Sequence, residues 1–336
     1  MDNPLLEVQN LQVHFINKDK VLRANDDLSY TVHQGECVAL IGESGSGKSV
    51  SALSILRLIP YPPGLIVGGK ILFHGRDLLE YSDKEMERLR GNQISMIFQE
   101  PMTSLNPVMT IGDQIAENLI YHRDMTKREA FEEAARLLSR MDIPRPEERL
   151  KDYPFQFSGG MQQRVMIAMA MSCRPEILIA DEPTTALDVT VQMQVLEQLD
   201  ALRKENNMAL IIITHNLGLV ARYADSVMIV YGGRIVESGR TRDVYKHPAH
   251  PYTIGLLRAV PRLDRPRSVS LSTIEGEPPD MSVLPPECCP FYDRCRFADE
   301  ICRCQRPSDA SVEGDGHICA CHHIDIVAAH AEEMLA

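Results

Sequence analysis

The chain has 336 residues and a formal net charge of −12 at pH 7, with 44% hydrophobic and 24% charged residues. This length predicts one large domain plus a small one, and the composition is that of an ordinary globular protein. The acidic balance disfavours long-range attraction to nucleic acid, so we expect no nucleic-acid partner. No apolar run approaches the roughly 18 residues that span a bilayer, and residues 1–4 do not resemble a secretion signal, so a cytosolic protein is expected.

The first predicted element is a strand over residues 5–15, because apolar and polar side chains alternate from Leu11 to Phe15. An aromatic ring at the end of such a strand can stack on a nucleotide base. It can equally pack in the core, and the sequence leaves both interpretations of Phe15 open.

Residues 42–49 form a complete Gly-x-x-x-x-Gly-Lys-Ser motif. The apolar run 37–41 before it predicts a buried strand, and residues 50–59 predict a helix that ends before Pro60. Glycines in this position let backbone N–H groups turn toward phosphates, and the helix N-terminus adds partial positive charge. Lys48 is expected to reach the β- and γ-phosphates and Ser49 to ligate Mg²⁺, so the chain is predicted to bind a nucleoside triphosphate. The predicted nucleotide contacts are Gly42, Glu43, Ser44, Gly45, Ser46, Gly47, Lys48, Ser49 and Val50.

Residues 60–64 and 68–69 predict a loop, followed by a strand with a turn at 70–75. The strand-like run 94–98 ends at Gln99, and the breaker-rich stretch 100–107 after it predicts a mobile joint. Residues 111–171 carry helical signals, among them a capping box of Thr126 and Glu129. A polar, proline-containing connection at 144–154 leads to the segment 157–164, which starts another helix.

The apolar strand 177–180 ends in Asp181 and Glu182. Ligands of open α/β sheets bind at the carboxyl ends of strands, so Asp181 is expected to hold Mg²⁺ and Glu182 to orient or deprotonate the attacking water. The alternative is a capping Asp before the turn 183–185. A helix follows, and then the strand 209–214 presents His215, which in this position can reach the γ-phosphate. Residues 227–231 and 234–237 predict a hairpin.

The phosphate loop, Gln99, Ser158-Gly159-Gly160, Asp181-Glu182, Ala186-Leu187-Asp188 and His215 together resemble the ATP-binding subunits of ABC transporters, in every element and in order. The resemblance covers residues 5–258. It implies an α/β P-loop ATPase fold: a core sheet with an antiparallel β lobe and a helical subdomain at about 100–172. It also implies a head-to-tail dimer in which Ser158, Gly159 and Gly160 serve the partner's nucleotide, and a helix that opens with such a turn is a second anion site.

The same resemblance assigns further roles. It implies that Gln99 contributes to the Mg²⁺ site, senses the γ-phosphate and couples to the permease. It also implies that Asp188 contributes to the nucleotide site and that His215 polarises the γ-phosphate. Three positions depart from the usual pattern, because Phe157 replaces Leu, Met161 replaces Gln and Asn216 replaces Asp. None of these changes removes a catalytic group, so ATPase activity is expected.

A narrower resemblance is to the first ATPase subunit of dipeptide and oligopeptide permeases, within the peptide and nickel importers. It rests on residues 99–107, 157–161, 180–188 and 250–253. In that group two different ATPase subunits form a heterodimer and drive two permease subunits that an extracytoplasmic binding protein supplies. The resemblance therefore implies a peripheral protein at the cytoplasmic face of the inner membrane.

Seven of the nine cysteines lie between Cys288 and Cys321, after a proline-bearing linker at 261–279. This clustering predicts a separate cysteine-rich module over residues 259–336, following an ATPase domain over 1–258. Disulfides are not expected in a reducing compartment, so the cysteines favour a metal or a cluster. Their spacing does not match the paired C-x₂-C zinc patterns.

The permease resemblance implies a [4Fe–4S] cluster in this module, with zinc as the alternative. Cys289, Cys295 and Cys302 match three ligand positions, and Cys321 fits the fourth position better than Cys319.

Two other hypotheses compete with the importer assignment. A soluble ABC ATPase acting on nucleic acid or ribosomes usually carries paired ATPase domains or long coiled coils, whereas this chain has one signature and no sustained heptads. The other hypothesis is a mainly structural half of a heterodimer whose partner carries the active site. The intact Glu182 and His215 argue against it, whereas the asymmetry of a heterodimer keeps it open.

Overall fold

The computed structural model describes residues 3–18, 20–99, 104–184, 188–260, 273–312 and 316–335. The chain divides into two compact units. The loop unit comprises Met1–Val32, Cys37–Leu79 and Thr214–Ala336, and the helical unit comprises His33–Glu36 and Glu80–Ile213. No helix in the described ranges is long and apolar enough to cross a membrane.

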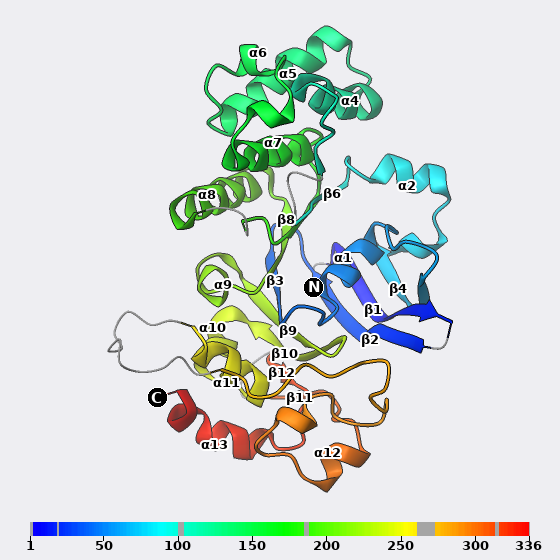
Figure 1. Cartoon of the computed structure of the whole chain (residues 1–336), viewed down its shortest axis with the longest axis vertical. Coiled ribbons are helices and arrows are strands. Elements are labelled where there is room, and N and C mark those ends of the chain that lie inside the picture. The colour runs from blue at the N-terminus through cyan, green and yellow to red at the C-terminus, as the bar shows by residue number, and fades with distance from the viewer. Residues whose placement is uncertain are drawn as a thin grey trace. The chain divides into compact units, whose positions relative to one another are not determined.

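The first sheet of the loop unit is antiparallel, with the strand order β2-β1-β4-β5 (Figure 1). In β1, Leu6, Val8, Leu11 and Val13 are buried, with a register shift between Val8 and Leu11. This alternation is the pattern of a sheet that packs one face on a core. The strands are β1 (Leu6–Asn17), β2 (Lys20–Val32), β4 (Gly64–Phe73) and β5 (Arg76–Asp77).

The second sheet of the loop unit runs β11-β12-β10-β9-β3. Every residue of β3 is buried, and β3 pairs in parallel with β9, which explains its unbroken apolar sequence. The strands are β3 (Cys37–Ile41), β9 (Ser226–Tyr231), β10 (Arg234–Arg240), β11 (Ala310–Ser311) and β12 (Ile318–Cys319). The helices of this unit up to residue 260 are α1 (Lys48–Ile55), α9 (Leu217–Tyr223), α10 (Thr241–Lys246) and α11 (Pro251–Arg258).

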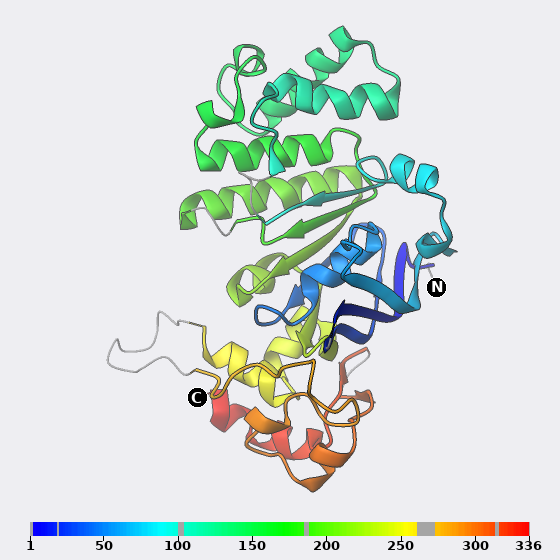
Figure 2. The same ribbon diagram turned by 45° about the vertical axis from the view of Figure 1, so that its right-hand side comes forward.

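The C-terminal segment, residues 273–335, is built into the loop unit. Strand β12 pairs antiparallel with β10, with Cys319 opposite Glu237. Helix α13 (Ile324–Leu335) packs along α11, because Val327, Ala331 and Met334 share a buried cluster with Ile254 (Figure 2). The segment also contains the short helices η3 (Tyr292–Arg294) and α12 (Glu300–Cys304). The predicted linker residues 261–272 lie outside the described part of the chain.

The helical unit combines three parallel strands of a sheet, in the order β8-β7-β6, with the helices between Asp83 and Asn206. Its strands are β6 (Ile94–Ile97), β7 (Ile177–Asp181) and β8 (Ala209–Thr214). Its α-helices are α2 (Asp83–Leu89), α4 (Ile111–Arg123), α5 (Lys127–Arg140), α6 (Pro146–Arg149), α7 (Gly159–Met171) and α8 (Val189–Asn206). The short 3₁₀ helices η1 (Leu78–Glu80) and η2 (Pro154–Gln156) precede α2 and α7.

Most predicted elements are present, and the capping box of Thr126 and Glu129 is confirmed. The helix predicted over residues 50–59 is wrong at its end, because α1 stops at Ile55. Arg57 adopts a left-handed φ of 51°, and the amide of Leu58 donates to the carbonyl of Leu53. This is the geometry of a helix C-cap, which glycine usually provides, so the sequence carried no signal for it.

Two further differences concern the antiparallel sheet. Gly68 and Gly69, predicted as a loop, lie inside β4 at a register shift against β1, where Gly69 has a φ of 92°. A glycine pair inside a strand is typical of a bulge. Strand β2 was not predicted, although the burial of Leu28, Tyr30 and Val32 alternates with exposed residues.

Candidate functional site

The phosphate loop connects β3 to α1 in the loop unit, as the motif predicts. Two of its glycines are sterically required. A Cβ on Gly42 would lie 2.2 Å from the carbonyl oxygen of Val230, and one on Gly47 would lie 2.3 Å from the carbonyl oxygen of Ala24. Gly47 also has a φ of 101°, which L side chains rarely adopt. The loop therefore folds against neighbouring backbone at a distance that only glycine allows.

Lys48 is the first residue of α1, and its ammonium group lies over the loop. The Nζ atom donates to the carbonyl oxygens of Gly42 and Glu43, both at 2.8 Å, and to the Ser46 hydroxyl at 3.2 Å. Ser49 and Val50 follow in the first turn of the same helix. A cation and the N–H groups of a helix N-terminus thus meet at one place, which is the chemistry that binds a phosphate chain.

Three groups from distant parts of the chain hold the loop backbone. The side-chain amide of Asn25 donates to the carbonyl of Gly47 at 3.0 Å, and the amide of Gly233 donates to the carbonyl of Ser46 at 3.0 Å. The amide of Glu43 donates to the hydroxyl of Tyr252 at 2.8 Å. Sequence motifs did not assign these roles, although Tyr252 lies in the segment 250–253 that carried the permease resemblance.

The start of α11 positions Tyr252. His250 caps this helix, with its Nδ1 accepting from the Tyr252 amide at 3.1 Å. Burial lowers the pKa of His250 to about 3, so the ring stays neutral and can accept this bond at physiological pH. The buried carboxylate of Glu237 accepts from the amides of Ala249 and His250, at 2.7 and 3.0 Å.

Phe15 and His215 also belong to the loop unit. Phe15 lies half-buried near the end of β1, opposite Gly64 of β4, so a role in base stacking stays a prediction. His215 directly follows β8 and is exposed. Asn216, one of the departures noted in the sequence, caps α9 by accepting from the amides of Gly218 and Leu219. Its amide side chain therefore performs the capping that an Asp would perform.

In the helical unit, Gln99 and Glu182 are brought together. The side-chain amide of Gln99 donates to Glu182 Oε2 at 3.0 Å. Asp181 is buried at the end of β7, and Glu182 follows with a left-handed φ of 46° while its amide donates to the carbonyl of Ile213. Such a backbone conformation is costly for a residue other than glycine and is typical of functional positions.

The predicted signature residues begin α7. Ser158 caps this helix by accepting from the Met161 amide, and Ser158 and Gly159 are exposed. A Cβ on Gly159 would meet no atom within 4 Å. Phe157, the second departure, is 6% exposed and lies under the Arg149 guanidinium, so its larger ring is accommodated by burial. The N-terminus of α7 is thus accessible to an anionic group from outside the unit.

Asp188 accepts at Oδ1 from the amide of Val191 at 3.0 Å, so its observed contact is at the start of α8. Ala186 and Leu187, which complete the predicted motif, lie outside the described residues, as do residues 100–103 of the segment after Gln99.

All nine cysteines lie in described ranges, and none of them forms a disulfide. Cys289, Cys295 and Cys302 belong to one apolar cluster, and the amide of Cys289 donates to the carbonyl of Cys302 at 2.8 Å. Burial raises the pKa of Cys289 to about 12, and the thiols of Cys302, Cys321 and Cys295 raise it further. Burial raises the pKa of Cys321 to about 11, with Cys295 and Cys302 adding to the shift. The four predicted ligands therefore lie near one another.

The remaining cysteines of the segment have other partners. The Cys288 thiol donates to the carbonyl of Arg303 at 2.6 Å, and the Cys304 thiol donates to Glu300 at 3.5 Å. Burial and then the Glu237 carboxylate raise the pKa of Cys319, which lies on β12 opposite Glu237. Asp299, Cys302 and His323 also form a group whose ligand atoms lie within 4.8 Å of one another.

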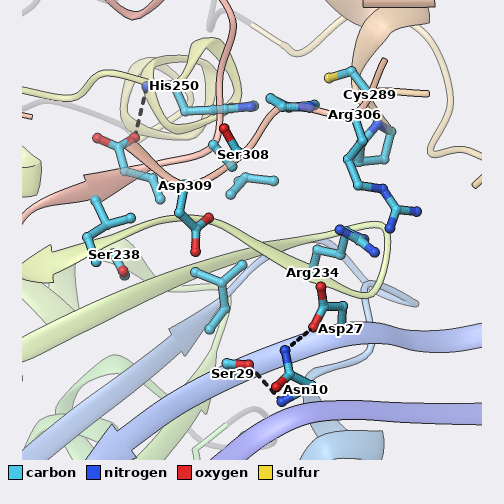
Figure 3. A pocket seen from close by; sticks show the side chains of 17 residues that line it. Asn10, Asp27, Ser29, Arg234, Ser238, His250, Cys289, Arg306, Ser308 and Asp309 are labelled. Atoms are coloured by element: carbon cyan, nitrogen blue, oxygen red, sulfur yellow. Dashed lines mark hydrogen bonds between the residues drawn. The ribbon is translucent and has the colours of Figure 1, made fainter. Parts of the chain in front are cut away.

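A separate cavity of about 460 Å³ lies in the loop unit, lined by β1, β2, β10 and the C-terminal segment (Figure 3). Arg234 and Arg306 in its wall both pair with Asp26, at 3.3 and 2.8 Å. Burial, and secondarily Asp27, raise the pKa of Asp309, which also lines it. None of residues 42–50 lines this cavity, so it is distinct from the phosphate loop.

The glycine-dependent loop between a buried parallel strand and a helix defines a P-loop nucleotide-binding protein. A family model described as "ABC transporter" matches residues 25–185, and one described as "Oligopeptide/dipeptide transporter, C-terminal region" matches residues 236–302. The chain belongs to the family of ATP-binding proteins of ABC transporters that includes the oligopeptide and dipeptide transport proteins.

Two relatives show the extent of the similarity. The oligopeptide transport ATP-binding protein OppD of Salmonella typhimurium is 50% identical over 317 residues, covering 94% of this chain and 93% of the relative. The dipeptide transport ATP-binding protein DppD of Bacillus subtilis is 47% identical and covers 97% of each chain. A solved dimeric ATP-binding cassette bound to ADP and phosphate is 25% identical, with a TM-score of 0.64 over 70% of this chain and 99% of that one.

We expect Glu182→Gln to lower ATP turnover by about 100-fold or more, because the carboxylate that would accept the proton of water is lost. The substituted amide keeps an oxygen that can accept from Gln99, so nucleotide binding should persist. Phosphate release and equilibrium ATP binding measure the two effects separately. Turnover at the wild-type rate would exclude the assigned role.

Proposed function

We propose that this chain hydrolyses ATP to power the uptake of dipeptides or oligopeptides through a membrane ABC importer. The observation that carries the proposal is the pairing of a complete phosphate loop with a C-terminal region matching the oligopeptide and dipeptide transporter model. The names of the two relatives state peptide transport for those proteins, and their similarity extends over nearly the whole chain.

The proposed chemistry gives each of the predicted residues its own role. Lys48 and the loop amides bind the phosphates, and Ser49 and Asp181 support Mg²⁺, which would neutralise charge between the β- and γ-phosphates. Glu182 accepts the proton of the attacking water, while His215 donates to the γ-phosphate. Gln99 contacts Glu182 at 3.0 Å, so a movement of Gln99 is transmitted to the catalytic carboxylate.

The exposed start of α7 supports a head-to-tail dimer with a second, homologous ATPase subunit. Ser158, Gly159 and Gly160 would meet the partner's nucleotide, because this helix end is exposed at Ser158 and Gly159 and a helix N-terminus binds anions. We propose a heterodimer, as in systems with two different ATPase subunits, working with two permease chains and a binding protein. The dimer would lie at the cytoplasmic face of the inner membrane as a peripheral component.

A groove of about 560 Å³ in the helical unit supports docking of a permease. Val108 and Tyr121 line it with exposed fractions of 79% and 59%, and Phe131 contributes a further ring. Asp113 at its edge is paired with Lys127 at 3.0 Å, and Glu117 adds a further carboxylate to the lining. Exposed apolar side chains around a concavity mark protein-binding sites. The proposed occupant is a short cytoplasmic segment of the permease with an apolar face.

Uptake by the reconstituted importer tests this function. Proteoliposomes that contain this chain, its ATPase partner, both permeases and a peptide-loaded binding protein should accumulate labelled peptide only with ATP. Val108→Asp should reduce uptake at least tenfold, because a buried unpaired carboxylate at the interface costs several kcal/mol.

Val283→Asp is the matched control, because Val283 is 70% exposed but lies outside the groove, and it should leave uptake unchanged. If the wild-type complex hydrolyses ATP without any peptide uptake, the proposed function is wrong. Equal uptake by the two variants would instead show that the groove is not part of the permease interface.

We also propose that the C-terminal segment holds a [4Fe–4S] cluster through Cys289, Cys295, Cys302 and Cys321. Four gathered thiols suit this cluster, and burial raises the pKa of each of them, so a bound cation would be needed to hold them as thiolates. Zinc is the alternative, and the group of Asp299, Cys302 and His323 offers it a mixed ligand set. When bound, the cluster would tie together parts of the segment that are distant in sequence.

Cys321→Ser and Cys319→Ser form a matched pair, since the two thiols lie two residues apart. Anaerobically purified wild-type protein should contain about four irons and four sulfides per chain. Cys321→Ser should lose most of this content, whereas Cys319→Ser should keep it. Iron, sulfide and zinc analysis with a visible spectrum provides the measurement, and stoichiometric zinc without sulfide would exclude the cluster.

A further inference from the structure

The second residue of the phosphate loop, Glu43, is bound by an arginine from the C-terminal segment. Arg294 contacts both oxygens of the Glu43 carboxylate, with Nη1 to Oε2 at 2.7 Å and Nη2 to Oε1 at 3.0 Å. The Arg294 side chain is 4% exposed and that of Glu43 is 27% exposed. This is a two-point, largely buried ion pair between segments 251 residues apart in sequence.

Every N–H group of the Arg294 guanidinium has an acceptor. Besides the two bonds to Glu43, Nε donates to the carbonyl of Glu275 at 2.9 Å, Nη1 to the Tyr231 hydroxyl at 3.2 Å and Nη2 to the carbonyl of Ile274 at 3.3 Å. A guanidinium has five N–H donors, so this one is fully satisfied and fixed in direction. A surface ion pair formed by chance would not show such a complete set of partners.

The backbone of Glu43 is held as firmly as its side chain. Its amide donates to the Tyr252 hydroxyl at 2.8 Å, and its carbonyl accepts from the Lys48 ammonium at 2.8 Å. The carboxylate therefore stays at the loop that is proposed to receive phosphates. A negative charge at this place repels a phosphate chain unless a cation neutralises it, and Arg294 is the cation in contact with it.

We propose that Arg294 is a positioning residue of the nucleotide site, which neutralises Glu43 and fixes it away from the bound phosphates. The C-terminal segment then belongs to the nucleotide-binding machinery, because its contribution reaches the phosphate loop directly. This inference rests on the proposed function only in that the loop binds a nucleotide. Since Arg294 immediately precedes Cys295, a proposed cluster ligand, the fold of the cysteine segment also sets the position of the guanidinium.

Equilibrium binding of MgADP to the purified full-length chain tests the proposal without interference from hydrolysis. Arg294→Met should weaken binding about tenfold at low salt, since an uncompensated carboxylate remains at the loop. Glu43→Gln should bind more tightly than the wild type, because the charge of Arg294 at the loop is then no longer compensated by the carboxylate. The double variant should return to within about threefold of the wild type, because the repelling charge is gone.

Salt dependence separates repulsion from a general loss of structure. The defect of Arg294→Met should shrink as ionic strength rises, because screening weakens repulsion but does not repair a misfolded loop. Arg296→Met is the matched control, because Arg296 lies on the other side of Cys295, is exposed and stacks on Phe297. It should bind MgADP as the wild type does.

The proposal is overturned if Arg294→Met binds as tightly as Arg296→Met, or if the double variant is as weak as Arg294→Met at every salt concentration. Failure of the wild-type chain itself to bind MgADP would overturn the proposed function as well. Urea unfolding midpoints identify a variant that fails to fold. If Arg294→Met fails to fold, the wild type and Glu43→Gln, which both keep Arg294, still compare the affinity for MgADP with and without the carboxylate.

Discussion

The close approach of backbone to backbone around Gly42 is the constraint on which the nucleotide site depends. A single methyl group there would meet the Val230 carbonyl at 2.2 Å, so the loop can pass only because its residue has no side chain. The approach lets the end of β9 and the following turn support the loop, with the amide of Gly233 bonded to the carbonyl of Ser46. The conformation of the phosphate loop thus depends on the strand and the turn that lie against it.

The C-terminal segment extends this support. Tyr231 from β9, Tyr252 from α11 and Phe291 from the segment form an aromatic cluster, with ring centroids 4.5 to 5.5 Å apart. Burial raises the pKa of both tyrosines, so their hydroxyls stay protonated. The Tyr252 hydroxyl accepts from the Glu43 amide and that of Tyr231 from Arg294. One apolar core therefore carries the polar atoms that hold the phosphate loop.

Local signals predicted most of the fold and the chemical motifs. The strand 209–214 is apolar from Ala209 to Ile213 and was predicted with its observed bounds, since burial on both faces favours an unbroken apolar run. The phosphate loop was equally predictable, because its function fixes four residue types at fixed spacing. The pairing of Gln99 with Glu182 was not predicted, although both residues had been assigned roles, because sequence does not state which side chains meet across two strand ends.

The sequence alone did not predict the contacts between segments that are distant along the chain. Asn25 lies in the unpredicted strand β2, and nothing in its neighbourhood marks it as a partner of Gly47. Arg294 is one basic residue among 35, and its role follows only from its two bonds to Glu43. The cysteine segment was predicted as a separate module, whereas it shares a buried cluster and a sheet edge with the loop unit. Composition marked its boundary but not the surface against which it packs.

Amide hydrogen exchange at Glu43 in the nucleotide-free chain tests most directly whether distant side chains hold the phosphate loop. Tyr252→Phe removes the acceptor of this amide while keeping the buried ring, and the strand β3, including Leu40, provides an internal reference. We expect the Glu43 amide to exchange about tenfold faster in this variant, with β3 unchanged, because only the local bond is lost. An unchanged exchange rate at Glu43 would contradict the account, since the loop would then keep its conformation without its support from α11.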